Sequence, residues 1–244
     1  MIFSAKRGVA VMSMVAFLAA GVSACTETSG PRSDILTACE TPGTSSGTLA
    51  NDPILFVHGY AGNGGNWQDM KARFLASGWQ PRELYACNYS FTASNVTSAA
   101  EIGAQVDEIL RVTGASKVDI ISFSMGSISS RYYLRNLGGI SKVDAWVSLA
   151  GPNHGTDAVE INNCSFAPCR EIAPGSSFLA DLNSGDETPG LVRYATWRSP
   201  CDTTINPDES VILMGATNNL TACIPHLAML TDPVVFSQVR AFVD

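Results

Sequence analysis

Short apolar runs alternate with longer amphipathic segments along residues 51–244 of this chain. The apolar runs with strand character lie at residues 53–57, 118–121, 143–149 and 191–197. Runs of this length, separated by helical patterns, are typical of strands in a parallel sheet. The pattern therefore predicts the α/β class, with a mostly parallel central sheet and helices on both of its faces.

Two of the expected helices have clear sequence signatures. In the first, apolar residues share one helical face, namely Ile102, Val106, Ile109 and Leu110. The second is expected to begin after Asp232 and Pro233, a capping residue followed by a proline suited to the first helical turn. Its inward residues are expected to be Val235, Val239 and Phe242.

The most informative stretch is Ser122-Phe123-Ser124-Met125-Gly126, which joins the apolar run at residues 118–121 to a helix expected from Ser127. It has the form of a nucleophile elbow, a tight turn that presents a serine hydroxyl at the start of a helix. Ser122 stands where glycine is usual, but it is small enough for the strand and helix to approach closely. Because so short a pattern also occurs in ordinary turns, it needs support from the rest of the chain.

A serine nucleophile of this kind needs a base and an acid that follow it along the chain, the acid first and the histidine last. The chain has three histidines. His58 precedes Ser124, and the only acid between Ser124 and His154 is Asp144, which lies inside an expected strand. His226, near the C-terminus, is therefore the expected base, and the other two histidines are expected to be structural.

The acid has several candidates, of which Asp202 has the best context. It follows the strand-like run at residues 191–197, so it lies in a loop beyond the carboxyl end of a strand, where functional groups of α/β sheets gather. Asp208 is the alternative, but residues 206–210 have the composition of a solvated turn. Asp202 is the expected acid.

Backbone N–H groups must stabilise the oxyanion that attack by serine creates. Met125 is expected to supply one. The loop at residues 58–67 follows the first apolar run and is rich in glycine, which lets a backbone approach a ligand closely, and Tyr60 is the expected second donor. The loop has neither the glycine spacing of a dinucleotide site nor the Lys-Ser/Thr ending of a phosphate loop, so nucleotide binding is not favoured.

With these residues in place, the chain resembles the class 2 lipases of bacteria, small α/β-hydrolases that include the minimal Bacillus lipases. The matching motifs cover nearly all of residues 51–244: Phe56-Val57-His58-Gly59-Tyr60, Trp67, Ser77-Gly78-Trp79, Ser122 to Gly126, residues 149–156, Ser199-Pro200-Cys201-Asp202 and Cys223-Ile224-Pro225-His226. The resemblance implies an α/β-hydrolase fold, a catalytic triad of Ser124, Asp202 and His226, and an oxyanion hole formed by Tyr60 and Met125. It implies no metal and no organic cofactor. Residues 157–190 form a longer segment than the minimal members need, and we expect this segment to be a rim that sets substrate access.

Residues 1–24 have the form of an export signal, with Lys6 and Arg7 before an apolar run too short to span a membrane. Residues 22–25 end in Cys25 and resemble the lipobox of bacterial lipoproteins, which implies lipidation of Cys25 and a location at the cell envelope. Ordinary cleavage after Ala24, giving a secreted protein, is the alternative. Residues 25–50 are then the lipidated N-terminus and a flexible tether, and residues 51–244 a single catalytic domain.

The chain has seven cysteines, an odd number that leaves one unpaired in an exported protein. If Cys25 carries lipid, the other six can pair, and six cysteines allow fifteen connectivities. Proximity in the sequence and the family resemblance favour Cys164 with Cys169, Cys201 with Cys223, and Cys39 with Cys87. A zinc site is disfavoured, because no Cys-x-x-Cys pair is present and an exported protein meets oxidising conditions.

The formal net charge of −7 argues against nucleic acid as a partner. The expected partners are an acyl-ester or lipid substrate and a membrane reached through the N-terminal anchor, with the protein itself a monomer. The expected activity is hydrolysis of carboxylic esters through an acyl-enzyme. Two alternatives stay open: an acyltransferase that uses the same triad, and a non-catalytic binding lipoprotein of the envelope on the same fold.

Overall fold

The computed structural model describes residue 39 and residues 48–158, 161 and 163–244. All of them belong to the compact unit Pro31–Asp244. The predictions of an export signal, a lipidated Cys25 and most of a tether fall outside the described residues, and they stay predictions.

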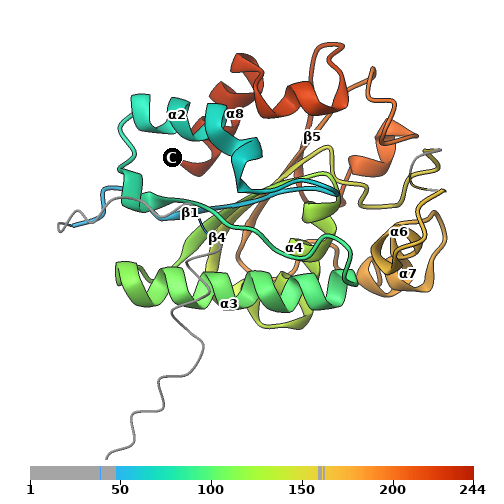
Figure 1. Cartoon of the computed structure of the whole chain (residues 1–244), viewed down its shortest axis with the longest axis horizontal. Helices are drawn as coiled ribbons and strands as arrows, with labels where there is room; N and C mark the ends of the chain where they lie inside the picture. The colour runs from blue at the N-terminus through green and yellow to red at the C-terminus, as the bar shows by residue number, and fades with distance from the viewer. Residues whose placement is uncertain (1–38, 40–47, 159–160, 162) are drawn as a thin grey trace, which may run out of the picture. The chain divides into compact units, whose positions relative to one another are not determined.

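A single six-stranded sheet runs through the described residues (Figure 1). Its strands are β1 (Ile54–Val57), β2 (Leu84–Ala86), β3 (Val118–Phe123), β4 (Val143–Leu149), β5 (Arg193–Arg198) and β6 (Thr217–Leu220). Their order across the sheet is β2-β1-β3-β4-β5-β6, and every neighbouring pair is parallel. The carboxyl ends of all six strands therefore lie along one edge. The prediction of an α/β fold with a mostly parallel sheet is confirmed, and the described sheet is wholly parallel.

Helices cover both faces of this sheet, as predicted. The α-helices are α2 (Gln68–Ala76), α3 (Asn95–Thr113), α4 (Met125–Asn136), α6 (Ala167–Glu171), α7 (Ser177–Leu182) and α8 (Pro233–Val243). Short 3-10 helices are η1 (Gly64–Trp67), η2 (Pro81–Glu83), η3 (Gly139–Ser141), η4 (Asp208–Val211) and η5 (His226–Leu230). In Figure 1, α2 and α8 lie on one face of the sheet and α3 and α4 on the other, while α6 and α7 lie beyond one end of α3.

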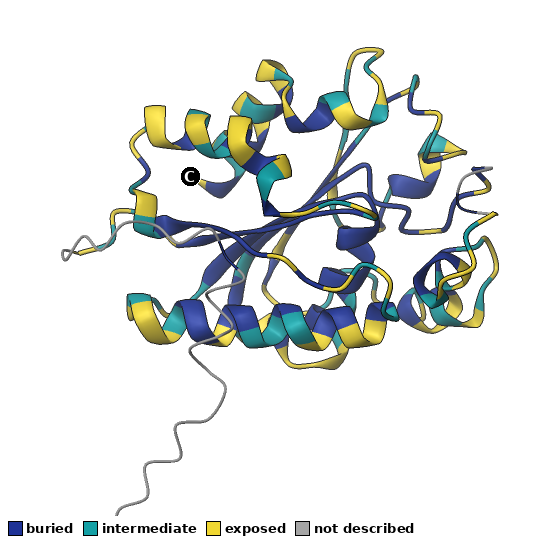
Figure 2. Ribbon diagram, viewed as in Figure 1, coloured by how far each residue is buried: buried dark blue, intermediate teal, exposed yellow. Residues whose placement is uncertain are grey.

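The alternation of side chains along the strands builds one apolar core on each face. In β1, Ile54 and Phe56 pack toward α2 and α8, whereas Leu55 and Val57 pack toward α3 and α4. Successive side chains of a strand point to opposite faces, so a strand covered on both sides must be apolar throughout. Figure 2 shows the result, with buried strands between helices whose outer faces are exposed.

The two helices predicted in detail lie where the sequence indicated. Ile102, Val106 and Ile109 of α3 are fully buried, whereas Leu110 is only partly covered. The side chain of Asp232 caps α8 by accepting from the N–H groups of Val234 and Val235 at 2.9 Å each. A side-chain cap at a helix start stabilises the helix by about 1 kcal/mol.

The described residues of the segment 157–190 contribute to a third apolar cluster against the start of α4. It contains α6 and α7, and its buried residues Ile172, Leu179 and Leu182 pack with Met125 and Ile128. The carboxylate of Glu171 ties the segment to the start of α3, because it accepts from the backbone N–H of Asn95 at 2.6 Å and from its side-chain amide at 2.9 Å. The segment is therefore a packed part of the fold beside the elbow.

The structure contains the three disulfides that proximity and family resemblance favoured. They join Cys39 to Cys87, Cys164 to Cys169 and Cys201 to Cys223. The third bridges the loops that follow β5 and β6, which carry Asp202 and His226.

Two local predictions need correction. Residues 206–210 are a solvated turn only in part: Asn206, Pro207 and Glu209 are exposed, but Ser210 is buried and Asp208 forms an ion pair with Arg198. The fourth apolar run begins its strand only at Arg193, and Leu191 is 91% exposed. No helix in the described part of the chain has both the length and the apolar character that crossing a membrane requires.

Candidate active site

The stretch from Ser122 to Gly126 forms a sharp turn between β3 and α4, as the elbow motif predicted. Ser124 has φ of 52° and ψ of −130°, a conformation that L residues rarely adopt. Its backbone N–H donates to the Leu149 carbonyl at 2.8 Å, and its carbonyl accepts from the Ser127 N–H at 2.9 Å. Strain of this kind costs about 1–3 kcal/mol and persists where the surroundings hold it, as they do at many functional sites.

Ser122 takes the place of the usual glycine without leaving a polar group unpaired. Its side chain is fully buried, and its hydroxyl donates to the Val147 carbonyl at 2.6 Å and lies 3.0 Å from the hydroxyl of Ser127. Serine can therefore replace glycine at position 122, because the neighbouring strand β4 supplies an acceptor for its hydroxyl.

Gly126 is required by the close approach of α4 to the end of β1. A Cβ atom at this position would lie 2.3 Å from the His58 carbonyl oxygen and 2.9 Å from that of Val57. Both obstacles are main-chain atoms, which cannot rotate away as a side chain can.

We expect Gly126→Ala to lower the free energy of unfolding by about 2 kcal/mol or more, because overpacking against a fixed backbone strains the elbow. Chemical denaturation measures the change. Gly138→Ala is the matched control, since Gly138 has a positive φ but a Cβ added there would meet no atom within 4 Å, and it is expected to lose only about 1 kcal/mol. Equal losses in the two variants would contradict this account of the elbow.

The glycine-rich loop after β1 lies directly against the nucleophile candidate. A Cβ at Gly59 would come within 2.9 Å of the Ser124 Cβ. The next residue, Tyr60, packs in the third apolar cluster together with Met125. Tyr60 and Met125 therefore share one apolar cluster beside the elbow, and the role of their N–H groups in an oxyanion hole stays a prediction.

The Asp202 carboxylate and the His226 imidazole form a close pair in loops after β5 and β6. The Asp202 Oδ2 atom lies 2.7 Å from the His226 Nδ1 atom. The other carboxylate oxygen accepts from the backbone N–H groups of Thr204 at 2.8 Å and Ile205 at 3.0 Å. These donors hold the carboxylate in one orientation, with its free edge toward the imidazole.

The ring of His226 packs beside the elbow. Its centroid lies 4.6 Å from that of Phe123, the residue before Ser124. Ser124 is 8% exposed, and the side chains of His226 and Asp202 are 11% and 1% exposed. The Asp202–His226 pair thus lies beside the elbow that carries Ser124, and these three side chains are largely sheltered from water.

Asp208, the alternative acid, has a different partner. Its carboxylate forms an ion pair with the guanidinium of Arg198, and it makes no contact with His226 among the described interactions. The arrangement favours Asp202 over Asp208.

His58 has the contacts of a structural residue. It is 1% exposed, its ring stacks on Tyr89 at 4.2 Å, and burial lowers the pKa of its imidazole. The Nδ1 atom lies 2.9 Å from the Gly59 carbonyl, and Nε2 accepts from the Tyr89 N–H at 3.4 Å. A neutral ring in this position fixes the start of the loop that carries Tyr60.

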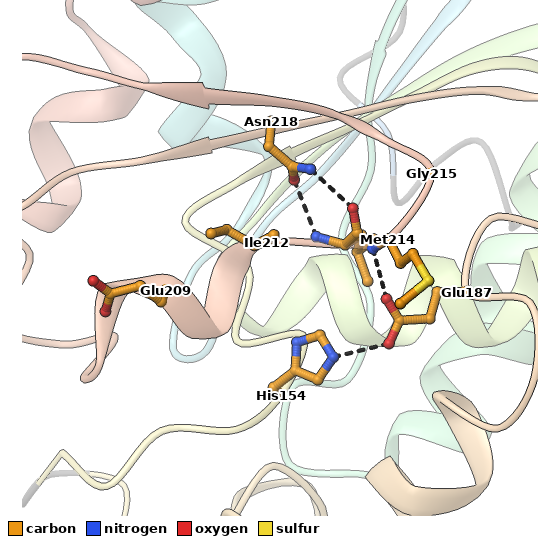
Figure 3. A pocket seen from close by; sticks show the side chains of 8 residues that line it. His154, Glu187, Glu209, Ile212, Met214, Gly215 and Asn218 are labelled. Atoms are coloured by element: carbon orange, nitrogen blue, oxygen red, sulfur yellow. Dashed lines mark hydrogen bonds and ion pairs between the residues drawn. The ribbon is translucent and has the colours of Figure 1, made fainter.

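His154 lies in a separate shallow pocket, shown in Figure 3. Its Nε2 atom is 2.9 Å from the Glu187 carboxylate, whose other oxygen accepts from the Met214 N–H at 2.7 Å. The pair joins the loop after β4 to residues before β5 and β6. His154 is therefore a cross-link between loops and takes no part in the Asp202–His226 pair.

No group of three or more histidine, cysteine or acidic side chains among the described residues is arranged to hold a metal ion. The six described cysteines are occupied in disulfides.

Two buried residues, Thr156 and Ser199, lie in motifs that match the family, but the sequence did not indicate that they support the site. Thr156, fully buried, donates its hydroxyl to the Thr204 carbonyl at 2.7 Å and accepts from the Asn206 N–H at 3.1 Å. It thereby ties the loop after β4 to the loop of Asp202. Ser199 makes a similar link to the histidine loop. Both act through main-chain groups of residues distant in sequence, and the motifs that contain Thr156 and Ser199 do not show these partners.

Comparison with known proteins places the chain in a family. Residues 51–215 match the family described as Lipase (class 2), and this is more than half of the chain. The chain therefore belongs to the class 2 lipase family, as its sequence motifs predicted. It is also 26% identical over 155 residues to the triacylglycerol lipase of Pseudomonas fragi, covering 59% of this chain and 50% of that protein. The chain thus spans about half the length of this curated relative.

Solved structures show the same fold. The mature lipase BlEst2 of Bacillus licheniformis superposes with a TM-score of 0.72 at 18% identity, covering 84% of this chain and 97% of that one. Lipase B of Aspergillus fumigatus gives a TM-score of 0.70 at 17% identity, covering 84% of this chain and 55% of that one. The fold is that of the α/β-hydrolases.

Proposed function

We propose that this chain is a serine hydrolase of carboxylic esters that works through an acyl-enzyme intermediate. The observation that carries the proposal is the meeting of three elements at one sheet edge. These are the strained Ser124 at the elbow, the Tyr60 loop packed against it, and the Asp202 carboxylate 2.7 Å from the His226 imidazole. Membership of the class 2 lipase family supports the same chemistry.

In the proposed mechanism, the Ser124 hydroxyl attacks the ester carbonyl while His226 Nε2 accepts its proton. The Asp202 carboxylate holds Nδ1–H and stabilises the imidazolium that forms. The backbone N–H groups of Tyr60 and Met125 donate to the oxyanion, where preorganised donors are worth several kcal/mol. His226 then protonates the departing alcohol, and a water molecule repeats the sequence to release the acid.

The substrates we propose are esters with acyl chains, because apolar side chains gather around Met125, the residue after Ser124. Tyr60 packs edge-on against Phe91 at 5.4 Å, and both contact the cluster that contains Met125 and the segment 157–190. This segment, which carries the Cys164–Cys169 disulfide, is our proposed rim for substrate access. A Cys164 sulfur lies 3.7 Å from the Tyr60 hydroxyl, so the rim reaches the oxyanion loop.

Anchoring at the cell envelope through Cys25 is part of the same proposal. The chain has seven cysteines, and six pair within the described residues, so the disulfide framework does not need Cys25. Secretion after cleavage at Ala24 is the alternative.

The proposal is tested by hydrolysis of p-nitrophenyl esters from short to long acyl chains, and of triacylglycerol emulsions. We expect saturable hydrolysis with an optimum in acyl-chain length, because an apolar rim favours chains that fill it. Addition of a primary alcohol distinguishes transfer from hydrolysis, since an acyltransferase would form the new ester in preference to the acid. Folded protein that cleaves no ester in either assay would contradict the proposal.

A further inference from the structure

Ser199 lies directly after β5 and is fully buried between the loop that carries Asp202 and the loop that carries His226. Its hydroxyl donates to the Ile224 carbonyl at 2.6 Å and accepts from the Ile224 N–H at 3.1 Å and the Cys201 N–H at 3.2 Å. The Ala222 carbonyl lies 3.3 Å away. A serine hydroxyl can donate one hydrogen bond and accept two, so the hydrogen-bonding capacity of Ser199 is fully used.

The two hydrogen bonds to Ile224 involve both its carbonyl and its N–H group. They therefore fix the position and the direction of the main chain at Ile224. His226 is two residues further on. Ser199 therefore controls the approach of the histidine loop to the acid loop.

Three cross-links join these loops in succession. Ser199 binds Ile224, Cys201 is bonded to Cys223, and Asp202 contacts His226. A disulfide acts mainly by restricting the unfolded chain. The hydrogen bonds of Ser199 act in the folded chain, where they hold both main-chain groups of Ile224.

The Asp202 carboxylate is already fixed within its own loop by the N–H groups of Thr204 and Ile205. The geometry of the Asp202–His226 pair then depends on where the histidine loop lies. We propose that Ser199 is a positioning residue for this pair: its hydroxyl sets the register of the two loops, whereas the Cys201–Cys223 disulfide serves stability. This inference rests on the proposed function.

Ser199→Ala is expected to lower kcat by about 10- to 100-fold, because a displacement of about 1 Å at a catalytic group can cost that much. KM should change by less than about threefold, since Ser199 is fully buried and its hydroxyl binds main-chain groups of the two loops. The Nδ1–H resonance of His226 in the proton NMR spectrum should weaken or shift as its bond to Asp202 loosens. A role in stability alone would move neither kcat at a permissive temperature nor this resonance.

The control is Thr221→Val, in the histidine loop; its partly buried side-chain hydroxyl donates to the neighbouring Ala222 carbonyl at 2.8 Å. This variant should keep kcat within about threefold. The double variant Cys201→Ser with Cys223→Ser should lower the melting temperature yet also keep kcat within about threefold. If Ser199→Ala does not fold, Ser199→Cys offers a weak donor of similar size, and the same loss of kcat is expected.

Unchanged kcat in the folded Ser199 variant would overturn the proposal. So would a disulfide variant that loses as much kcat as Ser199→Ala, because the disulfide would then set the geometry. These outcomes are distinct from failure of the proposed function, in which the wild-type protein itself would cleave no ester.

Discussion

Replacing Ser124 with alanine is expected to lower kcat for ester hydrolysis by at least about 10⁴-fold, with the fold retained. Removal of a nucleophilic serine has effects of this size, since only binding and oxyanion stabilisation remain. At about 1.4 kcal/mol per tenfold, the loss corresponds to at least about 5 kcal/mol of transition-state stabilisation. Initial rates on a p-nitrophenyl ester measure it.

The matched control is Ser141→Ala, in η3 at the amino end of β4, the sheet edge opposite the site. Its exposed hydroxyl binds the nearby Gly138 carbonyl, so its loss should leave kcat within about threefold. Alanine still carries a Cβ atom at the positive φ of residue 124, so the backbone strain there changes little. The Ser124→Ala variant should therefore keep its melting temperature. A Ser124→Ala protein that retained a tenth of the activity would contradict the role of this residue.

Asp202→Asn is expected to have the second large effect, a fall in kcat of about 10⁴-fold. Asparagine keeps the shape but not the charge, so it neither stabilises the imidazolium nor holds the required tautomer of His226. The backbone N–H groups of Thr204 and Ile205 can still donate to the amide oxygen, which favours a folded variant with its NH₂ group toward His226. Steady-state kinetics on the same ester gives the result.

Asp208→Asn separates the two acid candidates. Asp208 lies in the same connection between β5 and β6 but binds Arg198, so we expect a small loss of stability and kcat within about threefold. If Asp208→Asn abolished activity while Asp202→Asn did not, the acid would have been assigned wrongly.

The parts of the fold that the sequence predicted are those with buried strands. β3 and β4 are covered on both faces, so their runs are almost continuously apolar, and β1 is buried throughout. The elbow could be predicted because its geometry restricts residue types locally, as the Cβ contacts of Gly126 show. The order of acid and histidine along the chain then indicated Asp202 and His226 as the other two residues of the candidate site.

Two strands were not predicted from the sequence. β2 is buried, but with only three residues it gives too short an apolar run. β6 consists of Thr217, Asn218, Asn219 and Leu220 and lies at the exposed edge of the sheet, so it carries no apolar pattern. Asp208 was taken for part of a solvated turn because its partner, Arg198, lies ten residues away and on a strand. The support given by Ser199 depends on main-chain groups of Ile224, which any residue except proline could supply.

The central claim is that Ser124 forms a covalent acyl-enzyme with help from His226 and Asp202. Its most direct test is reaction of the purified protein with a fluorophosphonate, followed by peptide mass spectrometry. The account predicts one adduct, on Ser124, formed at the rate at which ester hydrolysis is lost, and none in Ser124→Ala. An adduct on another residue, or full hydrolysis by protein labelled at Ser124, would contradict it.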